Sequence, residues 1–109
     1  MIRIGLGITG SFCTFKNLLA AAEDLIRRGY DITPVFSFNV ASLDPRFFKA
    51  ADFADEIARL TGKRPITSIV DAEPIGTSMG LELMLVAPCT GNTLSKIANG
   101  ITDTPVTMA

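Results

Sequence analysis

The chain has 109 residues, of which 48% are hydrophobic and 19% charged, and its formal net charge is -1. This composition is typical of a single globular domain, and the small net charge gives no electrostatic case for binding nucleic acid or an acidic membrane. No stretch reaches the roughly 18 apolar residues of a membrane span, the N-terminus lacks the features of a signal peptide, and the absence of histidine excludes His-based triads and zinc sites from these residues.

The first part of the chain alternates between strand and helix patterns. Residues 2–8 are apolar apart from Arg3, which is typical of a strand buried on both faces of a parallel sheet. Apolar residues then recur at positions 15, 18, 19, 22, 25 and 26, which predicts a helix that ends at Gly29. Residues 31–38 predict a second strand, and Pro34 favours a sheet edge for it because proline cannot donate a ladder hydrogen bond.

The middle of the chain predicts one long helix followed by a region of turns. The helix should run over residues 45–60, begin at the Asp44 cap and end at Gly62. Its expected inward positions are Phe47, Ala50, Ala54 and Ile57. A short strand is expected over residues 66–70, and residues 71–82 are rich in turn formers and predict the longest loop.

The last part predicts another strand, helix and strand. Residues 83–87 are fully apolar and stop at Pro88, a helix follows over residues 93–99, and residues 105–108 begin a further strand.

Together these elements predict an α/β protein with a three-layer, doubly wound parallel sheet of the Rossmann-like or flavodoxin-like type. The flavodoxin-like strand order 2-1-3-4-5 agrees with an edge position for the second strand. Such sheets usually have five or more strands, and this chain offers only four main ones. We therefore expect residues 1–109 to form a single domain that lacks its C-terminal part, as the N-terminal portion of a longer domain would.

The loop after the first strand carries a glycine pattern that invites a dinucleotide interpretation. Gly5, Gly7 and Gly10 spell GxGxxG, but the first two fall inside the strand and no acidic residue ends the second strand, so we reject it. We interpret Gly10-Ser11 as a turn that binds a mononucleotide phosphate, which Ser37 could reach from the next strand. The alternative that stays open is that these residues only form turns and caps.

The loop after the apolar strand at residues 83–87 has the sequence PCTGNT and leads directly into a helix. Thr90 and Asn92 offer side-chain hydrogen bonds, and the backbone near Gly91 could touch a planar ligand. The alternative is that Asn92 or Thr93 simply caps the helix. Lys96, one turn further, is interpreted as a solvated surface residue.

Two cysteines, Cys13 and Cys89, are too few for a disulfide framework, and reduced thiols in the cytoplasm are the plain interpretation. Both lie near strand ends, so a redox pair or a reactive thiol is conceivable. Without a histidine or a CxxC spacing we favour small packing residues.

Residues 87–103 (APCTGNTLSKIANGITD) resemble the PASANT-type motif of the homo-oligomeric flavin-containing cysteine decarboxylases, a flavoprotein family. The Gly-Ser turn after the first strand and the serine after the second also resemble that family's pattern. The resemblance implies that the turn and this serine hold the phosphate of FMN, and that the PASANT-like loop lies against the flavin. The cofactor-binding residues that it implies are Gly10, Ser11, Ser37, Pro88, Thr90 and Asn92.

A branch of that family, the B subunits of dipicolinate synthases, resembles the chain more closely. The matching segments extend over essentially the whole chain, and the joint occurrence of SIVDAEPIG at residues 68–76 and APCTGNT at residues 87–93 is specific. The chain departs from the decarboxylases by lacking their histidine, and it has Phe12 where the B subunits often have histidine.

The resemblance implies a protein that works with the A subunit of dipicolinate synthase, which is nicotinamide-dependent and carries NADP. The pair would oxidise dihydrodipicolinate to dipicolinate during sporulation, in the cytoplasm of the mother cell of a spore-forming bacterium. It also implies a homo-oligomer, and it assigns no catalytic acid or base and no metal. Two alternatives stay open: a stand-alone FMN-dependent decarboxylase, against which the missing histidine argues, and a non-catalytic interaction subunit with an empty pocket.

Overall fold

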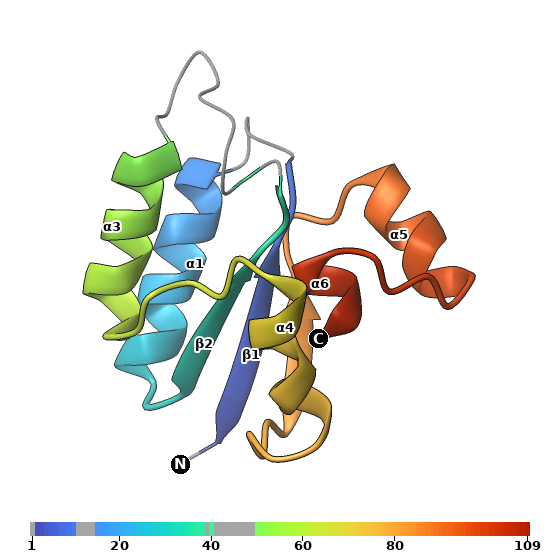
Figure 1. Cartoon of the computed structure of the whole chain (residues 1–109). Coiled ribbons are helices and arrows are strands. Elements are labelled where there is room, and N and C mark those ends of the chain that lie inside the picture. The colour runs from blue at the N-terminus through green and yellow to red at the C-terminus, as the bar shows by residue number, and fades with distance from the viewer. Residues whose placement is uncertain (1, 11–14, 39, 41–49) are drawn as a thin grey trace.

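The computed structural model describes residues 2–10, 15–38, 40 and 50–109, and its centre is a three-stranded parallel sheet (Figure 1). The strands β1 (Arg3–Ile8), β2 (Asp31–Phe36) and β3 (Leu83–Val86) lie in the order β2-β1-β3. The register pairs residues 3–8 with 31–36 and residues 4–7 with 83–86. This is the order of the first three strands of a flavodoxin-like sheet, which confirms the predicted fold class.

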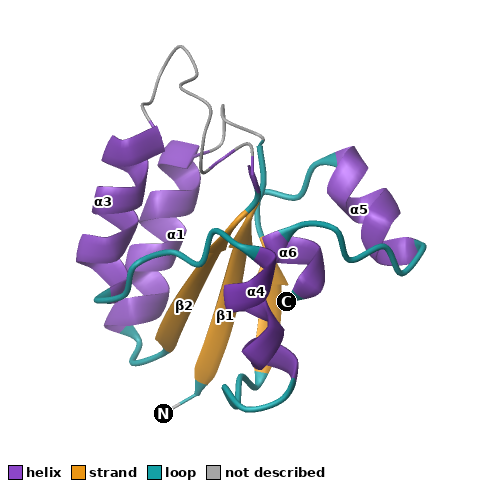
Figure 2. Ribbon diagram, viewed as in Figure 1, coloured by secondary structure: helices purple, strands orange, loops and turns teal. Residues whose placement is uncertain are grey.

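Helices cover both faces of the sheet, so that the molecule has three layers (Figure 2). The described helices are α1 (Phe15–Arg27), α3 (Ala50–Thr61), α4 (Ile69–Ala72), the 3-10 helix η2 (Glu73–Gly76), α5 (Gly91–Ala98) and α6 (Pro105–Met108). One face carries α1 and α3, the other carries α4 and α6, and α5 extends away from the sheet on the β3 side (Figure 1). None of the described helices is long and apolar enough to cross a membrane.

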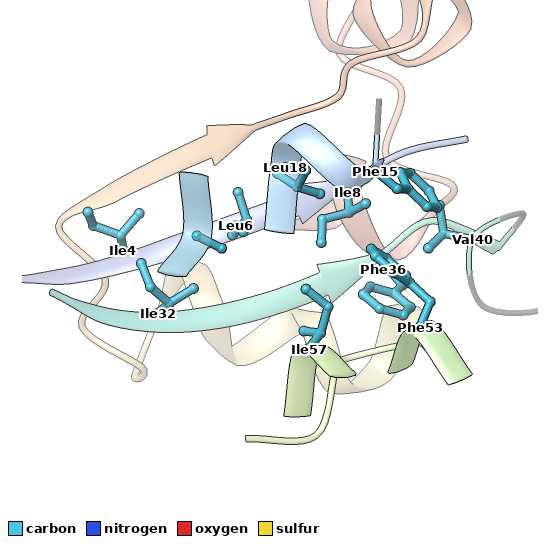
Figure 3. Packing of buried hydrophobic residues seen from close by; sticks show 11 residues of the cluster. Ile4, Leu6, Ile8, Phe15, Leu18, Ile32, Phe36, Val40, Phe53 and Ile57 are labelled. Atoms are coloured by element: carbon cyan, nitrogen blue, oxygen red, sulfur yellow. The ribbon is translucent and has the colours of Figure 1, made fainter. Parts of the chain in front are cut away.

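The larger hydrophobic core lies between the sheet and the two long helices (Figure 3). Alternate positions of β1 and β2 point into it, since successive strand residues face opposite sides of a sheet. Phe53 of α3 stacks on Phe15 of α1 and on Phe36 of β2, with ring centroids 4.3 and 5.5 Å apart. Leu18 and Ala22 are buried beside them, which confirms the helical stripe predicted for α1.

The opposite face of the sheet explains the two glycines inside β1. A Cβ atom on Gly5 would lie 2.6 Å from Met84 Sδ and 2.8 Å from Leu81 Cδ1. A Cβ atom on Gly7 would lie 3.0 Å from both Met84 Cε and Val106 Cγ1. The missing side chains therefore let neighbouring apolar groups approach the strand, and this packing role agrees with rejecting the dinucleotide interpretation.

The strand predicted over residues 66–70 and the loop predicted over residues 71–82 are wrong in part. Only Ile66 pairs as an isolated bridge, with Val35 on the outer side of β2, and helices α4 and η2 follow. The reason is local, because the Ser68 hydroxyl caps α4 by accepting a hydrogen bond from the backbone N–H of Asp71 at 3.1 Å.

The strand predicted over residues 105–108 is also wrong, because this segment is the short helix α6. Thr104 and Thr107 form a capping box in which each side chain accepts a hydrogen bond from the other's backbone N–H. Pro105 occupies the first helical position, where its missing N–H costs nothing. Val106 then packs with Val35 and Ala72 in a second, smaller core.

The remaining predicted elements differ from the structure mainly at their ends. The predicted helix over residues 45–60 corresponds to α3, where Ile57 is buried and Ala54 packs against the core. Residues 44–49 and the side chains of Phe47 and Ala50 lie outside the described part of the chain. The helix predicted over residues 93–99 is α5, which begins two residues earlier, at Gly91.

The third strand is apolar on both faces, but the described chain covers only one of them. Met84 and Val86 pack into the smaller core under α6. Leu83 and Leu85 alternate with them along the strand, point to the other face and are 55% and 39% exposed.

Candidate functional site

The carboxyl ends of the three strands meet at one edge of the sheet and form a small cavity of about 170 Å³. In open parallel sheets this edge is where ligands bind. The chain reaches the cavity from the ends of β1 and β2, from the first turns of α5 and from the start of α6. The described residues that line it are Thr9, Gly10, Ser37, Phe38, Thr90, Asn92, Thr93, Lys96 and Thr104.

Thr9 ties the end of β1 to the loop that follows β3. Its side chain is buried, with the residue 1% exposed, and its hydroxyl donates to the carbonyl oxygen of Pro88 at 2.6 Å. The same hydroxyl accepts from the backbone N–H of Thr90 at 2.8 Å, and the Thr9 N–H donates to the Pro88 carbonyl at 3.1 Å. These bonds fix the relative position of the two loops that wall the cavity.

Ser37 lies directly after β2 and is almost fully buried. Its backbone N–H donates to the Ile8 carbonyl at 3.0 Å, which holds the residue beside the end of β1. Its hydroxyl oxygen accepts a long hydrogen bond of 3.4 Å from the N–H of Val40. Because a hydroxyl is also a donor, this side chain can still offer its hydrogen to an anion in the cavity.

The N-terminus of α5 points its first turn toward the cavity. Thr90 is the cap, since its hydroxyl oxygen accepts from the Thr93 N–H at 3.1 Å. The alternative that Asn92 or Thr93 caps this helix is therefore wrong, and both residues lie inside the first turn. The exposed Asn92 side chain and the positive end of the helix dipole are left to face a ligand.

Lys96 is the charged residue that the sequence interpretation missed. It lines the cavity instead of pointing to solvent, with its side chain 23% exposed, and its Nζ donates to Asp103 Oδ1 at 2.9 Å. The sequence contained a signal for this orientation of Lys96. Residues three and four apart share a helix face, so Lys96 lies beside Asn92 and Thr93.

Of the six predicted cofactor-binding residues, four line the same cavity: Gly10, Ser37, Thr90 and Asn92. Pro88 instead accepts the hydrogen bonds of Thr9 and borders a shallow apolar depression beside α1. Ser11 lies outside the described residues. Sequence reasoning pointed to the loops that contain Thr9, Phe38 and Thr93 without choosing these residues as contacts, and it did not expect Thr104 at the site.

The cysteines give no support to a redox site. Cys89 is exposed, in contrast to the packing role expected for it, and its thiol donates to the Thr90 carbonyl at 3.7 Å. Cys13 lies outside the described residues. Within the described part of the chain, no group of three or more His, Cys, Asp or Glu side chains could hold a metal ion.

The fold and the site define a class of protein: a flavodoxin-like α/β protein with a hydroxyl-rich cavity at the carboxyl ends of its strands. The chain belongs to the Flavoprotein family, whose model matches residues 1–109.

Two curated relatives agree with that assignment. The B subunit of dipicolinate synthase from Bacillus subtilis (strain 168) is 47% identical over 107 residues, which cover 98% of this chain and 54% of that protein. The coenzyme A biosynthesis bifunctional protein CoaBC of Thermococcus kodakarensis is 36% identical over 110 residues, covering 96% of this chain and 25% of that protein. The chain thus spans about half the length of the first relative and a quarter of the second.

Two solved structures share the fold. The crystal structure of the dipicolinate synthase B subunit from Bacillus halodurans has a TM-score of 0.83 at 37% identity, over 98% of this chain and 55% of that one. The FMN-dependent cysteine decarboxylase SpaF has a TM-score of 0.76 at 22% identity, over 99% of this chain and 61% of that one, and at this identity the likeness concerns the fold alone.

The role of Thr9 can be tested by replacing it with valine, which has a similar shape but no hydroxyl. Thr9→Val should lower the free energy of unfolding by about 1–3 kcal/mol, because it leaves the partly buried N–H of Thr90 without its acceptor. Thr9→Ser keeps the hydroxyl and should lose clearly less. Urea denaturation followed by circular dichroism measures both, and equal losses for the two variants would contradict the proposed tie.

Proposed function

We propose that this chain binds the phosphate end of FMN and acts as the N-terminal portion of a dipicolinate synthase B subunit. The observation that carries the proposal is the convergence of Gly10, Ser37 and the N-terminus of α5 on one cavity. The 47% identity to the Bacillus subtilis relative of that name, over 98% of the chain, supports the specific role. Membership of the Flavoprotein family supports a flavin as the cofactor.

The chemistry of the donor set fits a phosphate. Gly10 has no side chain, so the backbone can approach the phosphate closely, and the Ser37 hydroxyl can donate to it. The first turn of α5 adds N–H groups and the positive end of its dipole. We also keep Ser11 as a proposed phosphate contact, although it lies outside the described residues.

The other end of the cofactor would lie along the loop from Pro88 to Asn92. Thr90 shapes this loop by capping α5, and the Asn92 amide offers both a donor and an acceptor to a polar ring edge. A bound flavin would supply the capacity to exchange electrons, which none of the described lining side chains has. The protein's part is then to bind and orient the cofactor.

The reaction that we propose for the whole protein is the oxidation of dihydrodipicolinate to dipicolinate, together with the A subunit of dipicolinate synthase, which carries NADP. Over the whole reaction the substrate gives up the equivalent of a hydride, which NADP+ finally receives, and a proton, which goes to solvent. The relative's designation as a B subunit supports the existence of a partner chain. On the same resemblance, we propose that the protein acts during sporulation in the mother cell. We also propose that it forms a homo-oligomer.

Flavin binding is the first test. Titration with FMN should quench flavin fluorescence and raise the melting temperature by several degrees, because a ligand at a hundred times its Kd stabilises a protein by about 2.7 kcal/mol. Ser37→Ala should weaken FMN binding by about tenfold or more, since a hydrogen bond to a charged group is worth about 1.5–3 kcal/mol.

Riboflavin, which lacks the phosphate, and Ser95→Ala, a change on the exposed side of α5, are the controls. Riboflavin affinity should be unaffected by Ser37→Ala, and FMN affinity should be unaffected by Ser95→Ala. A chain that retains no yellow colour after excess FMN is removed, and that gains no thermal stability from FMN, would instead favour the non-catalytic interaction subunit.

The reaction is a separate test. The protein that carries this chain, mixed with its partner A subunit, NADP+ and dihydrodipicolinate, should produce NADPH at a rate well above that of either protein alone. The absorbance of NADPH measures this rate. Turnover of a carboxylate substrate without the partner and without NADP+ would contradict the proposal and support the stand-alone decarboxylase.

A further inference from the structure

Lys96 brings a positive charge to the wall of the candidate site. Its side chain is 23% exposed and lines the cavity, whereas its partner Asp103 is 60% exposed and does not appear among the described lining residues. Lys96 therefore forms part of the cavity wall, whereas its partner carboxylate is the more exposed member of the pair.

The rest of the described lining is uncharged. Its polar side chains are the hydroxyls of Thr9, Ser37 and three further threonines, together with the amide of Asn92. No Asp or Glu is among the described lining residues. An anion that enters the cavity thus meets a lysine and several neutral donors, and none of the described lining residues carries a negative charge.

The ion pair with Asp103 does not use up the donors of Lys96. A lysine ammonium has three N–H donors on a flexible stem, and one of them reaches Asp103 at 2.9 Å. A pair with one largely exposed partner is also a weak contact. Lys96 can therefore turn a second N–H toward a ligand without first breaking a buried interaction.

Lys96 lies further along α5 than the groups that we propose to bind the phosphate. It follows Asn92 by four residues, which corresponds to about 6 Å along the helix axis at 1.5 Å per residue, on the same face of α5. The side chain of Thr104 lines the cavity as well, from the start of α6. Lys96 thus joins the cavity wall one helical turn after Asn92.

We propose that Lys96 binds an oxyanion of the ligand, either a carboxylate or a phosphate, on the α5 side of the cavity. The proposal rests on the proposed function for the identity of the cofactor. Two sources of the oxyanion are distinguishable: the phosphate of FMN, and a carboxylate of a pyridine-2,6-dicarboxylate-type substrate.

The test compares Lys96→Met with Lys96→Arg and the unchanged protein, using isothermal titration with FMN, riboflavin and pyridine-2,6-dicarboxylate. Lys96→Met should weaken binding of the recognised anion by about tenfold or more, and Lys96→Arg should retain most of the affinity. A loss for FMN but not for riboflavin identifies the phosphate, and a loss for the dicarboxylate alone identifies the carboxylate. Unchanged affinity for all three ligands would overturn the proposal.

Two further variants separate binding from structure. Asp103→Asn removes the ion pair but keeps the cation, so it should retain anion affinity within about threefold, a change of less than one kcal/mol. Lys63→Met removes a matched lysine, which pairs with Asp31 at 2.7 Å at the opposite end of β2, and should have no effect. If Lys96→Met and Asp103→Asn lose the same anion affinity, the effect is structural and the proposal is overturned. If Lys96→Met and Lys63→Met lose the same affinity, the effect is one of general charge, which also overturns the proposal.

Failure of the proposed function is visible separately. If the unchanged protein binds no FMN but binds pyridine-2,6-dicarboxylate in a Lys96-dependent way, the result contradicts the flavin assignment and supports the role of Lys96. If it binds FMN and Lys96→Met changes nothing, the role of Lys96 falls and the flavin assignment stands.

Discussion

The buried hydroxyl of Thr9 is the contact on which the shape of the site depends. It donates to the Pro88 carbonyl and accepts from the Thr90 N–H, so the end of β1 and the loop before α5 are held as one unit. Gly10 lies on one side of this tie and Asn92 on the other. Two loops that are about 80 residues apart in the chain are thereby brought to one cavity, in the way that parallel sheets bring their carboxyl ends together.

Regular patterns in the sequence were enough to predict strands β1 and β2 and helix α1. The apolar run of β1, the helical stripe of α1 and the edge position of β2 depend on burial periodicity and on proline chemistry, which are local properties. The candidate binding residues were found from the same patterns, because each of them lies at or soon after the end of a predicted strand. The predicted turn residue Gly10 and the loop residues Thr90 and Asn92 accordingly line one cavity.

The features that could not be predicted depend on short segments and on tertiary packing. Residues 105–108 contain β-branched residues, yet the Thr104 capping box and the contact of Val106 with Val35 favour a helix there. The orientation of Lys96 depends on the loop that carries Asp103 and on the direction in which α5 leaves the sheet. Helical spacing places Lys96 on the same face as Asn92, but its contact with Asp103 and the contact of Val106 with Val35 have no signature in the periodicity of the sequence.

The described residues of the cavity are suited to binding a ligand rather than to acid–base chemistry. The hydroxyls, the amide and the lysine among the described lining residues are suited to holding an anionic ligand, and the sequence has no histidine that could move a proton near neutral pH. This division of roles is consistent with a cofactor that brings the reactive group, as the Flavoprotein assignment suggests. The packing of Gly5 and Gly7 under Met84 and Val106 agrees with it, because the glycines of β1 serve the core rather than a dinucleotide.

The most direct measurement of the central claim is an amide chemical-shift titration of the 11.6 kDa chain with FMN. The largest shifts should fall on the backbone amides of Gly10, Ser37 and Asn92, with amides of α3 and of the opposite ends of the strands unchanged. Shifts that concentrate on α3 or on the start of β2, with Gly10 and Asn92 unaffected, would show that the phosphate does not bind where the three strands end.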